Sequence, residues 1–296
     1  MSVRPEVVGA ATASARKKVT PNILHQQRAA GTPITMLTAY DYPTAKACSA
    51  NPLIDITLVG DSLAQVCLGY ESTTQLTLRE MLYHVQAVAR GTKHPMLVAD
   101  MPFGSYQLSV DEAVANAFRL VQEGRAEGVK IEGGQEIAHI VRRITQAGIP
   151  VMGHIGLMPQ RYLATSGYRV QGRDLESAKR VVTDALYLQD AGAFALLVEG
   201  VPKELGKHVT EKVSIPTIGI GAGPSTSGQV LVWDDMMGTW SGHKAKFVRR
   251  FADVQTHRDV GVDAYAKAVR DRSFPSPDTE SYTMDPAVLA ELQSML

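Results

Sequence analysis

Four acidic residues close short apolar runs, and one lysine stands among them. Asp61, Asp100, Glu132 and Glu199 each end such a run, and Lys130 lies two positions before Glu132 in the stretch GVKIEGG. If this stretch is a β-strand, Lys130 and Glu132 point to the same face, because side chains alternate along a strand. Buried charges require a partner or a bound ion. Grouped carboxylates are oxygen ligands that suit Mg²⁺, so we expect Glu132 to face a metal and Lys130 to face either the carboxylates or an anionic substrate.

The elements that would position these residues form a regular pattern. From Pro33 onward, eight short apolar runs alternate with helix-like segments; the runs cover residues 34–40, 56–61, 96–102, 128–134, 150–157, 194–201, 215–223 and 229–235. This alternation predicts an α/β fold, namely a (β/α)8 TIM-type barrel with N- and C-terminal helical extensions. The strand ends of such a barrel meet at one mouth, where active sites lie, so the acids and the lysine should form one cluster.

Local signals support the helices, with one irregularity. Thr77 with Glu80, and Ser109 with Glu112, have the spacing of a capping box ahead of an amphipathic run. Only a few residues separate the seventh and eighth runs, too few for a full helix. Either this crossover is short or the eighth strand lies elsewhere.

Each charged residue also has a structural interpretation. A single acid after a strand most often caps a helix or pairs with a loop cation, whereas four acids on neighbouring strand ends favour a cluster. Lys130 alone could be a structural, ion-paired lysine. His154, after the fifth run, would point at the same mouth, and a histidine there is either functional or simply hydrogen-bonded.

Composition narrows the class of protein. The chain has 296 residues, of which 45% are hydrophobic, and its 30 basic residues balance its 30 acidic ones. A neutral chain lacks the basic excess typical of nucleic-acid and membrane-surface binders, so we expect neither partner. No apolar run approaches the roughly 18 residues that cross a bilayer. Two cysteines are too few for a disulfide framework and fit a reducing compartment.

The chain divides into three predicted segments: a basic extension at 1–30, a catalytic barrel at 31–255 and a C-terminal helical tail at 256–296. The extension holds five basic residues and one acid, Glu6. Such a leader is either a mitochondrial transit peptide or a plain basic extension. We therefore expect a mitochondrial protein, with a cytoplasmic one as the alternative.

Several motifs, in order over about residues 20 to 255, resemble those of the ketopantoate hydroxymethyltransferase family. They are LVGDSL (58–63), ADMPFGSY (99–106), VKIEGG (129–134), GHIGLMPQ (153–160), GYRVQGR (167–173), LVEGVP (197–202) and IGIGAG (218–223). VKIEGG and GHIGL-x-PQ are the most specific of them.

The resemblance implies a reaction. The family is a (β/α)8 barrel that transfers a one-carbon unit from 5,10-methylenetetrahydrofolate to 3-methyl-2-oxobutanoate, forming 2-dehydropantoate for pantothenate synthesis through a Mg²⁺-stabilised enolate. It implies an enzyme that binds a small keto-acid and a folate. It also implies a homo-oligomer, commonly a decamer.

The resemblance also assigns roles to individual residues. Glu199 corresponds to the catalytic base that accepts the proton. The metal ligands would be Asp61, Asp100 and Glu132, the last directly or through water. The keto-acid site would contain Asp61, Ser62, Asp100, Lys130 and His154, with the role of His154 the least defined.

Two other interpretations stay open. The phosphoenolpyruvate mutase and isocitrate lyase enzymes also combine Mg²⁺ with a keto-acid enolate in a barrel, but the lyases use a cysteine loop that has no counterpart here. A barrel that only binds a keto-acid would need no base, so the presence of Glu199 with the acid cluster argues against it. Turnover without folate would favour the first, and Mg²⁺-dependent binding without C3 proton exchange the second.

Overall fold

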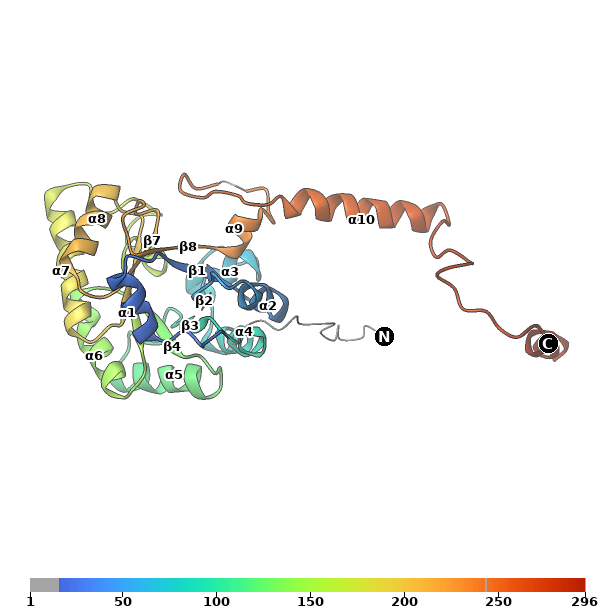
Figure 1. Ribbon diagram of the computed structural model, residues 1–296, viewed down its shortest axis with the longest axis horizontal. Helices are drawn as coiled ribbons and strands as arrows, with labels where there is room; N and C mark the ends of the chain where they lie inside the picture. The colour runs from blue at the N-terminus through green and yellow to red at the C-terminus, as the bar shows by residue number, and fades with distance from the viewer. Residues whose placement is uncertain (1–15, 243, 296) are drawn as a thin grey trace. The chain divides into compact units, whose positions relative to one another are not determined.

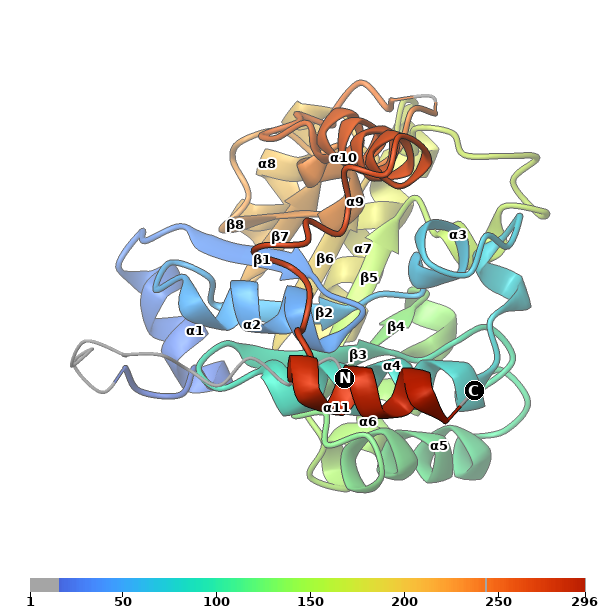
Figure 2. The ribbon, with the colours of Figure 1, turned by 90° about the vertical axis from the view of Figure 1, so that its right-hand side faces the viewer.

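The computed structural model describes residues 16–242 and 244–295 and contains a closed barrel of eight parallel strands in chain order, seen from two sides in Figure 1 and Figure 2. Pairing of the first strand with the eighth closes the barrel. The strands are β1 (Ile34–Thr38), β2 (Ile56–Val59), β3 (Met96–Asp100), β4 (Gly128–Glu132), β5 (Val151–Gly156), β6 (Ala195–Glu199), β7 (Thr217–Ile220) and β8 (Gly228–Leu231). The predicted α/β barrel is therefore confirmed.

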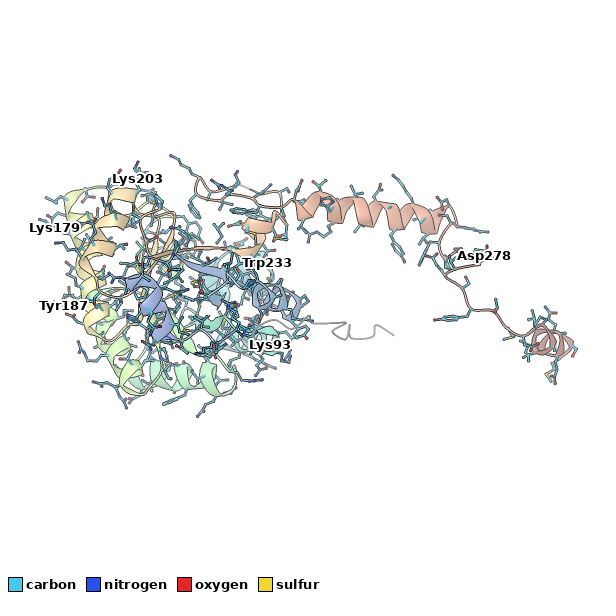
Figure 3. The ribbon with its side chains drawn as sticks, in the orientation of Figure 1. Lys93, Lys179, Tyr187, Lys203, Trp233 and Asp278 are labelled. Carbon is cyan, nitrogen blue, oxygen red and sulfur yellow. The ribbon has the colours of Figure 1, made fainter. Side chains whose placement is uncertain are left out.

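Helices follow six of the strands on the outside of the barrel. They are α2 (Tyr42–Ala50), α4 (Leu78–Gly91), α5 (Val110–Gln122), α6 (Ala138–Gln146), α7 (Leu175–Asp190) and α8 (Lys203–Lys212), with the short elements α3 (Leu63–Val66), η1 (Thr73–Gln75), η2 (Gln135–Ile137) and η3 (Pro159–Arg161). Figure 3 shows Lys179 and Tyr187 of α7 and Lys203 of α8 pointing outward. The described residues between β7 and β8, 221–227, contain no helix, so the crossover is short and the eighth strand is correctly placed.

The helix starts follow the predicted capping pattern. Thr77 and Glu80 form a complete capping box at α4, in which each side chain bonds the other's backbone N–H. At α5 the Ser109 side chain accepts a hydrogen bond from the Glu112 backbone N–H. These caps fix where two helices leave the loops that follow the strand ends.

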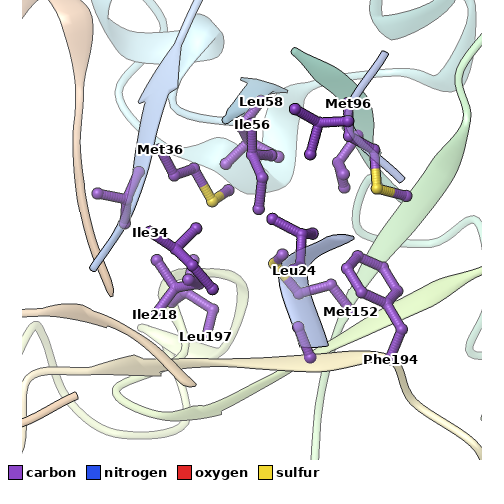
Figure 4. Close-up of a cluster of buried hydrophobic side chains, with 14 of the residues drawn as sticks. Leu24, Ile34, Met36, Ile56, Leu58, Met96, Met152, Phe194, Leu197 and Ile218 are labelled. Carbon is purple, nitrogen blue, oxygen red and sulfur yellow. The ribbon is translucent and has the colours of Figure 1, made fainter. Parts of the chain in front are cut away.

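The N-terminal end of the barrel is filled with apolar side chains. Helix α1 (Pro21–Ala29) contributes Leu24, which is fully buried. Figure 4 shows Leu24 among Met96, Met152 and Phe194, which are members of one buried cluster. The segment from Val19 onward therefore packs with the strands, because Val19 belongs to the same cluster.

Along a single strand the interior changes from apolar to charged. Met96, Val98 and Asp100 share one face of β3 because alternate side chains point the same way. The first two belong to the apolar cluster, and Asp100 ends the strand. All five residues of the β4 strand are buried, Lys130 and Glu132 included. The barrel interior thus carries its charge at the ends where the strands finish.

The chain forms two compact units. The first covers residues 1–233 and 244–248 and contains the barrel. The second covers residues 234–243 and 249–296 and includes α10 (Val254–Arg270), α11 (Pro286–Ser294) and most of α9 (Trp233–Met237). Every residue of α10 and α11 is described, and none is buried. The C-terminal helical extension is confirmed, while the boundaries at residues 30 and 255 stay predictions; half of the predicted leader, residues 1–15, lies outside the described residues.

Candidate active site

Three carboxylates lie together at the strand ends. Asp61 follows β2 by two residues, Asp100 ends β3 and Glu132 ends β4, and all three are buried. The Asp61 backbone N–H donates a hydrogen bond of 2.8 Å to Asp100 Oδ2. Ser62, the next residue, has its hydroxyl 2.7 Å from that of Tyr40. The structure therefore brings the predicted acids together.

Lys130 faces these carboxylates, which is one of the two arrangements that the sequence allowed. It is the strand partner of Asp100 across the β3–β4 pair. Its Nζ lies 2.9 Å from Asp100 Oδ1 and 4.0 Å from Glu132 Oε1. Burial lowers the pKa of the ammonium, but the Asp100 and Glu132 carboxylates raise it more, so its pKa ends above its usual value. Lys130 is therefore a buried cation paired with acids.

One ammonium does not neutralise three carboxylates. Burial raises the pKa of Asp100 to about 7; Lys130 opposes the shift and Asp61 adds to it. Burial also raises the pKa of Glu132 well above its usual value, and the charge of Asp61 contributes. Ionising all three acids is therefore costly unless further positive charge is present.

His154 of β5 links Lys130 to Glu199. Its Nδ1 lies 3.0 Å from Lys130 Nζ, and its Nε2 lies 3.2 Å from Glu199 Oε2. Burial and the Lys130 charge lower the pKa of His154 well below its usual range, so the ring is neutral. Because the ammonium can only donate, Nδ1 accepts and the ring proton sits on Nε2, facing Glu199. The contact with Glu199 is close but not aligned as a hydrogen bond.

Glu199 is the most accessible acid of the group. It ends β6, and its side chain is 15% exposed, against 1% for Glu132. Burial raises its pKa from 4.5 to about 7, and Lys130 opposes the shift. A carboxylate with this pKa can accept a proton near neutral pH and remain open to a ligand.

Two residues of the site, Gln160 and Tyr106, were not predicted from the sequence. Gln160 of η3 donates a hydrogen bond from its side-chain Nε2 to Asp61 Oδ2 at 2.9 Å and from its backbone N–H to Glu132 Oε2 at 3.0 Å. Tyr106 donates from its hydroxyl to Gln160 Oε1 at 2.7 Å. Both residues lie in motifs that carried the family resemblance, ADMPFGSY and GHIGLMPQ, which was the available signal.

The donor set suits a hard divalent cation, although the side chains do not surround one as they stand. Across the residues that the structure describes, no three His, Cys, Asp or Glu are placed together to hold a metal ion. Asp61, Asp100 and Glu132 nevertheless offer only oxygens, as Mg²⁺ prefers. Glu132 Oε1 is buried and has no hydrogen-bond partner in the described part of the chain. The residues therefore fit the ion in their chemistry.

A model of the ketopantoate hydroxymethyltransferase family matches residues 18–277. The chain belongs to this family. Among its ketopantoate hydroxymethyltransferase relatives, the 3-methyl-2-oxobutanoate hydroxymethyltransferase of Thermoanaerobacter sp. (strain X514) is 49% identical over 269 residues, covering 91% of this chain and 97% of that protein. The enzyme of the same name from Emericella nidulans is 46% identical over 288 residues, covering 97% and 82%. The chain is thus a transferase.

Solved structures with the same fold include those of more distant enzymes. A 2,3-dimethylmalate lyase of the PEP mutase/isocitrate lyase superfamily superposes with a TM-score of 0.56 at 18% identity, covering 93% of this chain and 94% of that one. A phosphonopyruvate hydrolase gives 0.55 at 14% identity, covering 94% and 95%. At such identities the likeness concerns the barrel alone. Within the described residues of this family member, none of the helices has the length and apolar character to span a bilayer.

Proposed function

We propose that the chain transfers a hydroxymethyl group from 5,10-methylenetetrahydrofolate to 3-methyl-2-oxobutanoate, forming 2-dehydropantoate in pantothenate biosynthesis. The names of the relatives at 45–49% identity support the keto-acid substrate. The observation that carries the proposal is Glu199, a partly open carboxyl with a pKa of about 7 beside the buried acids and Lys130. This arrangement suits removal of a proton next to a carbonyl group.

The acids Asp61 and Asp100 would hold Mg²⁺, with Glu132 as a third ligand, directly or through water. Bound there, the ion supplies Lewis-acid polarisation of the keto oxygen, which makes the neighbouring C3–H more acidic. Burial, with a contribution from the Asp61 charge, raises the pKa of Asp100 and Glu132, and a divalent cation would stabilise both groups in their charged form, which supports this assignment.

Glu199 would remove the C3 proton. Its raised pKa makes it a stronger base than an ordinary glutamate, and the neutral His154 presents an N–H to the same carboxylate. Lys130 and Ser62 would bind the keto-acid, the lysine through its positive charge. Because both Lys130 and His154 are buried, their positions are set before substrate arrives.

The reaction forms one carbon–carbon bond and one carbon–oxygen bond. The C3–H electron pair becomes available as the proton passes to Glu199, and C3 forms a new bond to the methylene carbon of the folate in its opened iminium form. The electron pair of the C=N bond moves onto the folate nitrogen as the C3–methylene bond forms. In the following hydrolysis water forms the new C–O bond as the methylene C–N bond breaks, and the second water proton goes to the nitrogen of the departing tetrahydrofolate. The residues of the mouth contribute the base, the cation site and the anion-binding lysine.

Two further expectations accompany this proposal. The family resemblance implies a homo-oligomer, a decamer, and sedimentation of the purified protein would give the number of subunits. The basic leader implies a mitochondrial location, with the cytoplasm as the alternative; microscopy of a full-length fluorescent fusion, beside one lacking residues 1–15, would separate them.

The test is product formation with a labelled donor. The purified chain is incubated with the keto-acid, Mg²⁺ and tetrahydrofolate carrying a ¹³C methylene group, and 2-dehydropantoate is followed by mass spectrometry. We expect a product with one ¹³C atom, formed only when folate is present. A folded protein that forms no labelled product, or that cleaves a methylisocitrate-type substrate without folate, contradicts the proposal.

A further inference from the structure

Gln160 reaches across the mouth of the barrel to residues at the ends of three strands. Its Nε2 donates to Asp61 Oδ2 at 2.9 Å and to the Met101 carbonyl oxygen at 3.0 Å, while its backbone N–H donates to Glu132 Oε2 at 3.0 Å. The side chain is almost completely buried, with 3% exposed. Gln160 thus holds one oxygen of each of two buried carboxylates, Asp61 and Glu132.

Tyr106 fixes the orientation of the Gln160 amide. The tyrosine hydroxyl lies 2.7 Å from Gln160 Oε1 and 3.1 Å from the Glu132 carbonyl oxygen, so its single proton is shared between these two acceptors. Burial raises the pKa of Tyr106 above its usual value, so the phenol keeps its proton and remains a donor. A flipped amide would place Oε1 against the Asp61 carboxylate and the Met101 carbonyl oxygen, two groups that only accept hydrogen bonds. Only one orientation of the amide is therefore compatible with its neighbours.

The turn that carries Gln160 is also anchored outside the barrel. Gln160 lies in the short helix η3, and the next residue, Arg161, forms an ion pair with Glu136 of η2. The Arg161 backbone N–H donates to the Met158 carbonyl oxygen at 2.9 Å. The Gln160 backbone N–H is therefore held where it meets Glu132.

We propose that Gln160 is a positioning residue for the cation site: it holds Asp61 Oδ2 and Glu132 Oε2 so that the second oxygen of each carboxylate is presented to the same Mg²⁺ ion. This inference rests on the metal part of the proposed function. The amide is suited to the task because it donates hydrogen bonds without adding charge. A lysine there would neutralise the acids and weaken their attraction for a cation, and a glutamate would repel them.

A merely structural role for Gln160 would also account for its contacts, and metal affinity separates the two. Gln160→Met keeps the length of the side chain and removes the amide donor to Asp61 and the acceptor for Tyr106, while the backbone N–H that bonds Glu132 stays. Gln160→Asn keeps the amide and shortens its reach, and Tyr106→Phe leaves Gln160 in place without the bond to Oε1. Gln135→Met, at an exposed glutamine of η2, is the matched control.

The experiment is calorimetric titration of the full-length proteins with Mg²⁺, in the absence of substrate, with circular dichroism and thermal melting as the check on folding. We expect Gln160→Met to weaken Mg²⁺ binding by about 10- to 100-fold, as loss of a group that orients a ligand typically does. Gln160→Asn should lose a similar factor and Tyr106→Phe a smaller one. Gln135→Met should bind as the parent does.

The outcomes are distinct. A folded Gln160→Met protein that binds Mg²⁺ as tightly as the parent overturns the inference and leaves the proposed function intact. If that variant does not fold, unchanged affinity in both Gln160→Asn and Tyr106→Phe overturns it instead. A parent protein that binds no Mg²⁺, with or without the keto-acid, overturns the metal part of the proposed function and the inference with it.

Discussion

The two ends of the barrel interior use the same strands for opposite purposes. At the N-terminal end, residues such as Met96 of β3 and Met152 of β5 form an apolar cluster closed by Leu24. At the C-terminal end, the same strands present Asp100 and His154. Burial of apolar surface stabilises the fold, whereas burial of charge costs free energy. The difference indicates that one end holds the barrel together and the other is organised for chemistry.

The polar end also leaves some bonding capacity unused. Among the described residues, three buried side-chain atoms of the mouth make no well-formed hydrogen bond: Asp100 Oδ1, Glu132 Oε1 and His154 Nε2. Each has a close polar neighbour: Asp100 Oδ1 lies 2.9 Å from Lys130 Nζ, His154 Nε2 lies 3.2 Å from Glu199 Oε2, and Glu132 Oε1 lies 3.5 Å from His154 Nδ1. Their surroundings are therefore poorly aligned rather than empty. Buried polar groups of this kind are typical of sites that bind a ligand or ion.

The largest effect should follow from removing the base. Glu199→Gln keeps the shape of the side chain but cannot accept the C3 proton, so exchange of that proton should slow by about 10²- to 10⁴-fold. Exchange is measured by NMR with the keto-acid in D₂O. Glu204→Gln, an exposed acid on α8 after the same strand, is the matched control and should exchange at the parent rate. Exchange at the parent rate in Glu199→Gln would exclude this residue as the base.

Removing the buried ammonium of Lys130 should lower the free energy of unfolding. Lys130→Met leaves Asp100 and Glu132 without their ammonium partner, and breaking a buried pair in this way costs about 3–5 kcal/mol. Urea unfolding of the metal-free protein at pH 8 gives the loss. Lys179→Met removes an exposed lysine, paired with Glu176 at 3.0 Å, and should cost at most about 1 kcal/mol. If both variants lost the same free energy of unfolding, the pairing of Lys130 with the buried acids would not contribute to stability.

A cavity at the apolar end should lower the stability of the protein and leave the rate of C3 proton exchange unchanged. Leu24→Ala leaves a cavity where α1 meets the strands and should cost about 2–5 kcal/mol. The exchange rate per folded molecule should not change, because Leu24 packs near the starts of the strands, beside Met96 at the first position of β3. Leu108→Ala, at a leucine that is 78% exposed, is the control and should cost little. Slower exchange by folded Leu24→Ala protein would show that the two ends are coupled.

The pH dependence of stability should report the free energy that the buried Glu199 carboxylate costs the folded state. Burial raises the pKa of Glu199 from 4.5 to about 7, so the folded state holds this proton more tightly than the unfolded state. Stability therefore falls as pH rises from 4.5 to 7, by up to about 3 kcal/mol from this group. Glu199→Gln lacks this loss, and its stability relative to the metal-free parent should rise across the same window in urea titrations. A difference between the two proteins that does not change with pH would contradict the raised pKa.

The sequence predicted the framework of both ends well. The apolar runs located all eight strands, although the runs were longer than the strands, as at residues 34–40, where β1 ends at Thr38. The run continues because Ala39 and Tyr40 stay buried beyond the last strand residue. The convergence of Asp61, Asp100 and Glu132 was predictable because parallel strands finish at one end of a barrel.

The hydrogen-bonding detail of the mouth was not predictable. Gln160 carries no charge, and it meets Asp61 across 99 positions of sequence, Tyr106 across 54 and Glu132 across 28. These contacts exist only once the turn after β5 lies over the ends of β2 to β4. The neutral state of His154 likewise depends on its burial beside Lys130 of the neighbouring strand. Pairing across elements, and not local pattern, decides such features.

The central claim, that the polar end generates a carbanion equivalent from a keto-acid, is tested most directly by proton exchange without folate. The purified protein is incubated with 3-methyl-2-oxobutanoate in D₂O, with and without Mg²⁺, and the C3 proton is followed by NMR. The account predicts loss of the C3 signal that requires both protein and Mg²⁺. A signal that persists with Mg²⁺, and still persists when tetrahydrofolate is added, would contradict it.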